Sequence, residues 1–197
     1  MMIDATGRPG LPRFSAARGG GLRCYPALRS LAEVRRVVLH QWGAHASLVR
    51  RRGESLEESA IRRARSVPYH LSVFSGGLVV WAWPATVSSW ASNGYNRTSL
   101  AIGVGGRFPG LERDRLPVHS QIEDFADGLR VALAAVAEQL PGLAIVTHRQ
   151  ASRGRGADPG EALARVAARA ACALGLRVDF DHTIGEGRPC PRLWSAL

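Results

Sequence analysis

Four side chains of this sequence are of the types that can hold and use a metal ion: two histidines, an aspartate and a tyrosine. His40 ends an apolar segment, and His148 stands ten positions ahead of Asp158, with Tyr69 between the two histidines in the sequence. Catalytic zinc is bound by three protein ligands, and water takes the fourth position, where its pKa falls to roughly 7. His40, His148 and Asp158 supply three ligands of suitable types.

Both histidines follow short apolar runs that are typical of buried strands. Residues 35–40 form one such run, which ends at His40, and residues 143–147 precede His148 in the same way. We therefore expect both imidazoles to leave the ends of rigid strands and to meet near the start of the helix that follows Asp158.

Each of these residues also has a simpler interpretation. A histidine after an apolar run is often a buried, hydrogen-bonded imidazole or a surface residue. Residues 158–161 form a capping box with proline at the first helical position, so the Asp158 carboxylate could instead cap a helix. A tyrosine in a strand, such as Tyr69, usually packs in the core or against a neighbouring strand.

The candidate residues belong to four fragments that run in order along roughly residues 34–165. They are His40, the dipeptide Tyr69-His70 at a separation of 29, the N-x-x-S pattern of residues 96–99, and His148 with the Asp-Pro-Gly of residues 158–160. In type and order these fragments resemble the zinc-dependent N-acetylmuramoyl-L-alanine amidases, the type 2 family that also contains phage amidases and animal peptidoglycan recognition proteins. One fragment alone has low specificity, whereas four in this order are fairly specific.

The resemblance implies a zinc-dependent hydrolase that cuts the amide bond between N-acetylmuramic acid and L-alanine in peptidoglycan or its fragments. It implies that Zn²⁺ is bound by His40, His148 and Asp158. It also implies that Tyr69 lies beside the metal, where its hydroxyl would hydrogen-bond the oxyanion or the attacking water. Amide hydrolysis builds negative charge on the carbonyl oxygen, which zinc and a phenol can both stabilise.

Further residues are expected to contact the substrate around this centre. The aromatic segment at residues 81–95 would border the groove for the glycan and stem peptide, with ordinary core packing as the alternative for its aromatic side chains. Within and beside this segment, Trp90 and Asn96 are the candidate substrate contacts. His45 follows His40 by five residues and would line the same cleft.

The sequence departs from the family at positions that bear on catalysis. Many relatives carry a lysine two residues before the last ligand, but Gly156 stands here and the chain contains no lysine. Arg153 or Arg155 could reach the site, but a guanidinium stays protonated and cannot exchange a proton. Some relatives carry a glutamate in the strand after N-x-x-S, where this chain has Gly103 and Gly105. Glu161, or another carboxylate that the sequence does not locate, is then the candidate general base. The alternative function is a module of the same fold that binds wall fragments without cleaving them.

Length and composition indicate one domain that favours anionic partners. The chain has 197 residues, 46% of them hydrophobic, and a formal charge of +10 whose basic residues are all arginine. Nucleic acid, acidic lipid and the polyanionic bacterial wall all fit this charge. No RNP, helix-turn-helix or zinc-finger pattern is present, so we expect no specific nucleic-acid binding. Three cysteines without C-x-x-C spacing disfavour a disulfide scaffold and fit a reduced compartment.

The N-terminal segment differs in composition from the rest. Residues 1–24 are rich in Gly, Pro and Arg, so we expect a flexible basic arm ahead of an amidase-like domain at residues 25–197. The arm has no apolar h-region, and we expect neither a signal peptide nor a transmembrane segment. The protein is therefore expected in the cytoplasm as synthesised, and a wall substrate would require lysis, a secretion apparatus or recycled fragments. The sequence does not indicate an oligomeric state.

Hydrophobic periodicity predicts interleaved strands and helices. Helices are expected at residues 55–65, 122–140 and 159–174, strands at 35–40, 69–74, 78–83, 99–104 and 143–147, and an edge strand or tail at 177–180. Residues 75–77 indicate a hairpin, and Ser55 with Glu58 forms a capping box. We therefore expect an α/β protein, a single three-layer domain with a mixed central β-sheet flanked by helices. His70 would point to the sheet face opposite Tyr69 and be buried and hydrogen-bonded.

Overall fold

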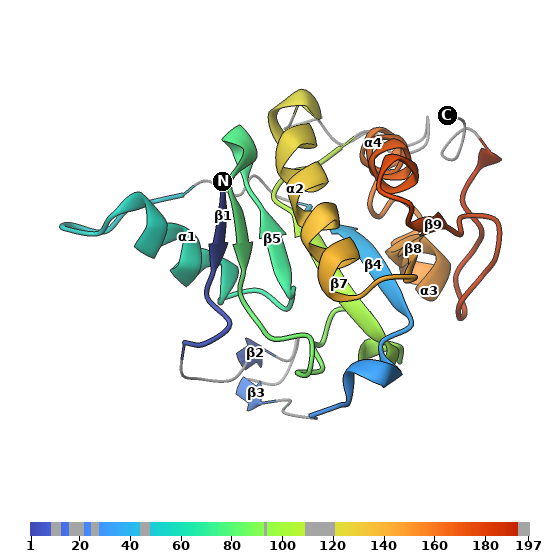
Figure 1. The fold of residues 1–197 in the computed structure, drawn as a ribbon, viewed down its shortest axis with the longest axis horizontal. Helices are drawn as coiled ribbons and strands as arrows, with labels where there is room; N and C mark the ends of the chain where they lie inside the picture. The colour runs from blue at the N-terminus through green and yellow to red at the C-terminus, as the bar shows by residue number, and fades with distance from the viewer. Residues whose placement is uncertain are drawn as a thin grey trace.

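A seven-stranded mixed sheet forms the centre of the structure, in the order β1-β6-β5-β7-β4-β8-β9 (Figure 1). The strands are β1 (Met2–Asp4), β4 (Arg36–Gln41), β5 (Leu71–Val73), β6 (Val79–Trp81), β7 (Ser99–Val104), β8 (Ala144–Thr147) and β9 (Arg177–Val178). Neighbouring strands pair in parallel except β5 and β6, which are antiparallel. This computed structural model describes residues 1–8, 13–15, 22–24, 28–43, 48–92, 94–108 and 121–192.

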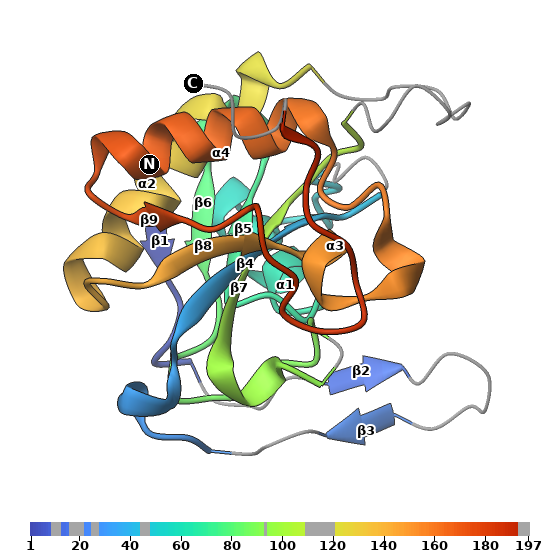
Figure 2. The ribbon, with the colours of Figure 1, turned by 90° about the vertical axis from the view of Figure 1, so that its right-hand side faces the viewer.

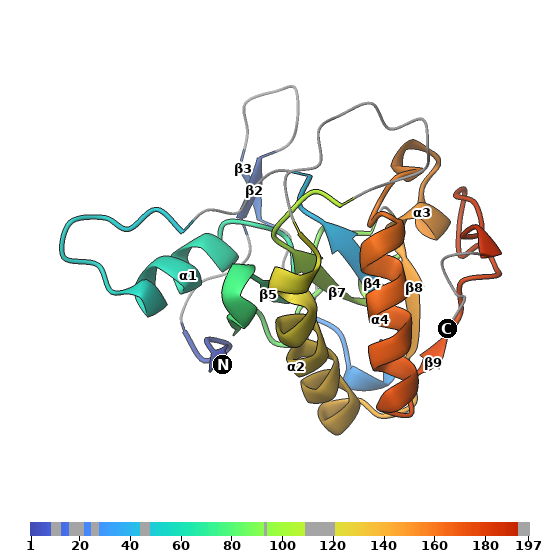
Figure 3. The same cartoon turned by 90° about the horizontal axis from the view of Figure 1, so that it is seen from above.

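Helices cover both faces of the sheet and give three layers. Helices α2 (Glu123–Gln139) and α4 (Glu161–Ala173) lie on one face, as Figure 2 shows, and α1 (Leu56–Ala64) packs on the other at the β6 end of the sheet (Figure 3). The sheet has a hydrophobic core on each face, and successive residues of β6 point into different cores. Val79 packs with α2 and α4, and Val80 packs with α1. The predicted three-layer α/β domain with a mixed sheet is confirmed.

The capping and periodicity patterns that predict helices in the sequence are present in α1 and α2. At the start of α1 the Ser55 hydroxyl accepts the Glu58 backbone N–H at 3.1 Å, and the Glu58 carboxylate accepts the Ser55 N–H at 2.8 Å, so the predicted capping box is present. Helix α2 buries residues at helical spacing, including Phe125, Leu129 and Leu133, against the sheet. None of the helices in the described residues combines the length and apolar character needed to cross a bilayer.

The central strand β4 sets the position of the candidate site. Its residues 37–40 are buried, and it pairs in parallel with β7 on one side and β8 on the other. In this register His40 lies opposite Gly103 of β7, and Leu39 lies opposite Thr147, the last residue of β8. His40 and the residue that follows β8 therefore come out at the same edge of the sheet.

The described residues of the N-terminal segment include short strands. Met2–Asp4 form the edge strand β1, and Ile3 packs in the same core as Ala60 and Ile61 of α1. Further along, β2 (Arg13–Ser15) and β3 (Leu22–Cys24) form a separate antiparallel pair. Three short strands therefore lie within the segment whose Gly, Pro and Arg content predicts a flexible arm, and in β1 one inward apolar residue, Ile3, accompanies the pairing with β6.

Candidate metal centre

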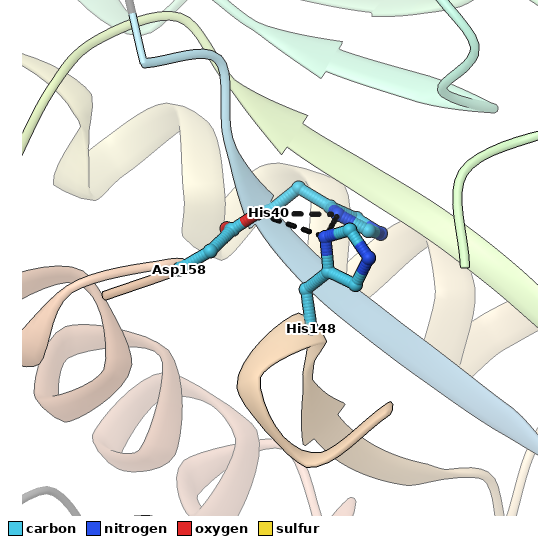
Figure 4. A group of neighbouring side chains, drawn as sticks. All are labelled: His40, His148 and Asp158. Atoms are coloured by element: carbon cyan, nitrogen blue, oxygen red, sulfur yellow. Dashed lines mark hydrogen bonds and ion pairs between the residues drawn. The ribbon is translucent and has the colours of Figure 1, made fainter. Parts of the chain in front are cut away.

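Three ligand atoms converge from distant parts of the chain (Figure 4). The Nδ1 atoms of His40 and His148 are 3.0 Å apart, and Asp158 Oδ2 lies 2.9 Å from His148 Nδ1 and 3.9 Å from His40 Nδ1. Four ligands in a tetrahedron around zinc, with bonds of about 2.0–2.1 Å, stand roughly 3.3 Å from one another. The triangle of donor atoms therefore has the size of one face of such a tetrahedron.

The donor set also has the chemistry of a cation site. His40, His148 and Asp158 are 1%, 4% and 8% exposed, so water satisfies them poorly. The Nε2 atoms of both imidazoles are buried and have no hydrogen-bond partner among the described residues. Because Nδ1 of each ring faces the other ring and the carboxylate, Nδ1 is the nitrogen that each histidine presents to a metal.

Asp158 links the two histidine-bearing segments. Its Oδ1 atom accepts the backbone N–H of Gln41 at 2.9 Å, while Oδ2 faces His148. The helix α4 begins at Glu161 with Gly160 as its N-cap, and no side chain caps it. The alternative in which Asp158 caps this helix is therefore wrong, because both carboxylate oxygens are engaged at the centre.

Hydrogen bonds of the Gln150 side chain hold the turn that carries His148. His148 is the first residue of the short helix α3 (His148–Ala151), for which Thr147 is the N-cap. The side chain of Gln150 accepts the Thr147 backbone N–H at 2.8 Å, and its amide donates to the Asp179 carbonyl at 2.7 Å. These bonds hold the chain direction at the end of β8, so the His148 side chain is directed toward β4.

The backbone of Asp158 and of the two residues before it is hydrogen-bonded to Gln41 and Arg149, which follow the two histidines. The backbone N–H of Arg149 donates to the Asp158 carbonyl at 2.9 Å, and the Arg149 guanidinium donates to the Gly156 carbonyl. From β4, the side-chain amide of Gln41 donates to the Ala157 carbonyl at 2.9 Å. The third ligand is therefore held by backbone contacts to both histidine segments.

Burial and mutual contact shift the pKa values of His40 and Asp158. Burial, followed by the neighbouring His148, lowers the pKa of His40 to about 4. Burial alone would raise the pKa of Asp158, but hydrogen bonds from His148 and His40 bring it well below its ordinary value. Neutral imidazoles and an ionised carboxylate are the forms that bind a metal.

Tyr69 lies beside the centre, between α1 and β5. Its ring centroid is 5.1 Å from that of His40, and its ring occupies the space directly over Gly103. Burial, followed by the charge of Asp158, raises the pKa of the Tyr69 phenol, which keeps its proton. The adjacent His70 is fully buried, accepts the Ala101 N–H at Nδ1 at 3.0 Å and has its Nε2 2.7 Å from the Val87 carbonyl, as predicted.

The two further catalytic candidates are placed differently. Arg155 ends the single turn η4 (Arg153–Arg155) and is exposed, and its positive charge acts weakly on two groups of the centre: it adds to the larger effect of burial in lowering the pKa of His40, and it slightly opposes the larger effect of burial that raises the pKa of Tyr69. Glu161 is the first residue of α4, and its carboxylate pairs with Arg165 at 3.5 Å along that helix. The structure therefore leaves Arg155 as an exposed charge with a weak effect on the centre, and gives Glu161 a partner on its own helix.

The substrate-contact candidates are spread over the fold. Trp90 is 44% exposed in the connection between β6 and β7. Asn96 begins the turn η3 (Asn96–Thr98), where its Oδ1 accepts the Ser92 N–H at 2.7 Å; this turn precedes β7, whereas Gly103, the partner of His40, lies near the far end of that strand. The structure thus gives Asn96 a turn-forming role away from the metal ligands. His45 lies outside the described residues.

Two neighbours of the centre were not expected from the sequence. Gln41 and Trp42 follow His40 directly, and the Trp42 ring stacks near Tyr69 with centroids 6.1 Å apart. Their position next to a candidate ligand was the available signal. Arg29 gave no signal: it is 5% exposed, and its guanidinium donates to four backbone carbonyls, those of Ala85, Asn96, Arg97 and Ser99.

With fold and centre established, comparison with known proteins gives the family. The sequence profile of the N-acetylmuramoyl-L-alanine amidase family matches residues 30–161, well over half of the chain, and the protein belongs to this family. The match spans His40, Tyr69, His148 and Asp158. A search of curated proteins gives no significant match.

Solved structures of similar fold come from phage, bacterial and recognition proteins. The endolysin of the Thermus scotoductus bacteriophage Ph2119 is 18% identical, with a TM-score of 0.50 over 81% of this chain and 92% of its own. The amidase LysC from Clostridium intestinale is 12% identical, with a TM-score of 0.54 over 90% and 99%. The peptidoglycan recognition proteins LCa and LCx, solved with tracheal cytotoxin, give 21% identity and a TM-score of 0.52 over 82% and 91%. At these identities the likeness concerns the fold.

Proposed function

We propose that the protein is a zinc-dependent hydrolase that cleaves the amide bond between N-acetylmuramic acid and L-alanine in peptidoglycan or its fragments. The observation that carries this proposal is the convergence of His40 Nδ1, His148 Nδ1 and Asp158 Oδ2 within a chain of the amidase family. Two imidazoles and a carboxylate are a common ligand set for catalytic zinc.

The chain's own residues would prepare the site in two ways. His40, His148 and Asp158 would hold Zn²⁺, which when bound supplies Lewis acidity that polarises a carbonyl and lowers the pKa of water. The contacts recorded for Tyr69 among the described residues are those of its ring, so its hydroxyl would be available to donate to the carbonyl oxygen of the substrate as that oxygen gains negative charge. The charge of Arg155 would favour the same anionic state without exchanging a proton.

A binding module without activity is the second candidate. Its motivation is Gly156, where many relatives carry a lysine, and Gly103 with Gly105, in the strand where some relatives carry a glutamate, together with the fold likeness to recognition proteins solved with tracheal cytotoxin. A substrate of the same class, peptidoglycan or a muropeptide, is expected for both candidates.

Digestion of purified muropeptides, scored by mass spectrometry, tests the proposal. The zinc-loaded protein should release free stem peptides, and His40→Ala, His148→Ala and Asp158→Ala should each abolish release together with stoichiometric zinc. Arg130→Ala, on the solvent side of α2 with 67% of its side chain exposed, is the matched control and should retain both.

The same experiment distinguishes the zinc-dependent hydrolase from the binding module. Intact muropeptide after long incubation with protein that contains one zinc per chain would refute the hydrolase and favour the binding module. Absence of zinc from the purified wild-type protein, after supplementation, would refute both the metal assignment and the mechanism built on it.

A further inference from the structure

Packing, and not hydrogen bonding, fixes the position of the Tyr69 ring. Among the described residues the contacts recorded for Tyr69 are those of its ring, which is partly buried beside His40. A phenol that donates to a reacting carbonyl has to be held within a fraction of an ångström, and a misplacement of about 1 Å can cost about 100-fold in rate. The residues that contact the ring therefore bear on catalysis.

Gly103 lies directly under the Tyr69 ring and leaves room for it. A Cβ atom at position 103 would lie 2.1 Å from Tyr69 Cδ2 and 2.5 Å from Cγ, far inside van der Waals contact. Gly103 has ordinary strand geometry, so the backbone does not require glycine there; the tyrosine ring does. Gly103 also pairs with His40 across β7 and β4. The position of the Tyr69 ring above the sheet is therefore fixed relative to a candidate metal ligand.

Trp42 packs against the same ring. Its ring centroid lies 6.1 Å from that of Tyr69 with an interplanar angle of 29°, which is an offset stack. The indole is itself held, since Phe74 meets it edge-on at 5.5 Å and the Arg63 guanidinium carbon lies 5.0 Å from its ring centroid. The Trp42 backbone N–H donates to the Val104 carbonyl at 3.0 Å and extends the β4 register by one residue.

We propose that Trp42 and Gly103 are positioning residues that hold the Tyr69 hydroxyl at the reacting carbonyl; this rests on the proposed function, in which Tyr69 donates to that oxygen. Arg63 and Phe74 act indirectly, because they contact the Trp42 indole and hold it in position. This assignment explains why position 103 is a glycine: the Tyr69 ring occupies the space that a longer side chain would need.

A double-mutant cycle tests the role of Trp42. Trp42→Ala should lower kcat roughly 10- to 100-fold with KM changed by less than about twofold, because only a transition-state contact is misplaced. Trp42→Phe keeps a ring at this position and should restore kcat to within about threefold of wild type. In a Tyr69→Phe background, Trp42→Ala should change kcat by less than about twofold, since the group it positions is gone. All variants should keep one zinc per chain.

A readout that does not depend on activity is ¹⁹F NMR of protein labelled with 3-fluorotyrosine. The chain has three tyrosines, and Tyr69→Phe identifies the Tyr69 signal. In Trp42→Ala this signal should move toward the position of free fluorotyrosine, in Trp42→Phe it should stay near wild type, and the Tyr95 signal should not move.

Two results would overturn the inference. One is an unmoved Tyr69 signal in Trp42→Ala, and the other is an equal loss of kcat from Trp42→Ala with and without the Tyr69 hydroxyl. A wild-type protein without amidase activity would refute the proposed function and with it the catalytic purpose of the ring, while the NMR series would still decide whether Trp42 orders Tyr69.

Discussion

The carboxylate of Asp158 contacts the histidine segments through different oxygens: Oδ2 lies 2.9 Å from His148 Nδ1, and Oδ1 accepts the backbone N–H of Gln41 at 2.9 Å. Because Gln41 follows His40 directly, the third ligand also fixes the strand that carries the first. The three donors are therefore held together by contacts within the protein, and donors held in this way lose less entropy when they bind a metal.

Asp158→Asn separates these two roles. The amide oxygen can still accept the Gln41 N–H, so the fold should be kept, but the anionic ligand is lost. We expect zinc affinity to fall by roughly 100-fold or more, beyond the 10- to 100-fold typical of losing an outer partner of a ligand. Competition with a zinc chelator measures it. Affinity equal to wild type in Asp158→Asn would exclude Asp158 as a ligand.

Gly103→Ala tests the space under Tyr69. The added methyl group cannot coexist with the present ring position, so the ring must move, and we expect kcat to fall toward the level of Tyr69→Phe, roughly 100- to 1,000-fold below wild type if the hydroxyl contributes as one oxyanion donor. Zinc content should remain one per chain. Gly154→Ala is the control, because no heavy atom lies within 4 Å of the added Cβ. Unchanged kcat in Gly103→Ala would contradict the assigned role of the ring.

The strands and ligands of the site were predictable because their signals are local. Apolar runs end at His40 and His148 in the sequence, and in the structure β4 and β8 lie side by side, so two strand exits meet at one edge. What the sequence could not decide was the use of the Asp158 oxygens. A capping carboxylate and a metal ligand have the same local pattern, and only the position of Gln41 on a neighbouring strand distinguishes them.

Contacts between segments distant in sequence explain what was missed. The stack of Trp42 on Tyr69 needs the register of β4 against β7 and the return of the chain after α1, neither of which leaves a periodic pattern. The edge strand β1 is three residues long and is defined by its pairing with β6, not by its own composition. The turn at Asn96 faces Arg29 and Ser92, so its amide closes a loop away from the ligands.

His70 predicts how stability depends on pH. Its Nδ1 accepts the Ala101 N–H, so Nε2 carries the proton that bonds the Val87 carbonyl, and burial, followed by the charge of Arg29, lowers its pKa to about 3. An unfolded histidine has a pKa near 6.5. Between these values the unfolded chain binds a proton that the native state does not, so the stabilisation is complete above about pH 6.5 and falls as the pH drops, by up to about 1.4 kcal/mol per pH unit.

Urea unfolding in EDTA from pH 7.5 to 5.0 measures this dependence without a contribution from metal. His70→Asn keeps a side-chain acceptor for the Ala101 N–H and removes the titration, so its stability should depend less on pH than that of wild type. The other buried histidine that affects this range, His40, is present in both proteins and cancels in the difference. Parallel curves for the two proteins would show that the pKa of His70 is the same in the native and the unfolded state.

Arg29 should be the most important single arginine for stability. Burial lowers the pKa of its guanidinium to about 10, and the group donates to the carbonyls of Ala85, Asn96, Arg97 and Ser99. It joins the segment before β4 to both ends of the connection between β6 and β7, the connection that carries Trp90. Arg29→Met keeps the length of the side chain but leaves these acceptors unpaired, and each buried group without a partner costs about 1–3 kcal/mol.

We therefore expect Arg29→Met to lower the free energy of unfolding by about 3–5 kcal/mol, or to prevent folding, since whole domains are stable by only about 5–15 kcal/mol. Arg130→Met is the matched control: that side chain is 67% exposed and pairs with Asp127 at 3.6 Å, an exposed pair of the kind that contributes less than about 1 kcal/mol. Chemical denaturation of both variants compares them directly. Equal losses in the two variants would mean that the carbonyls around Arg29 find other partners, and that its network does not hold the β6–β7 connection in place.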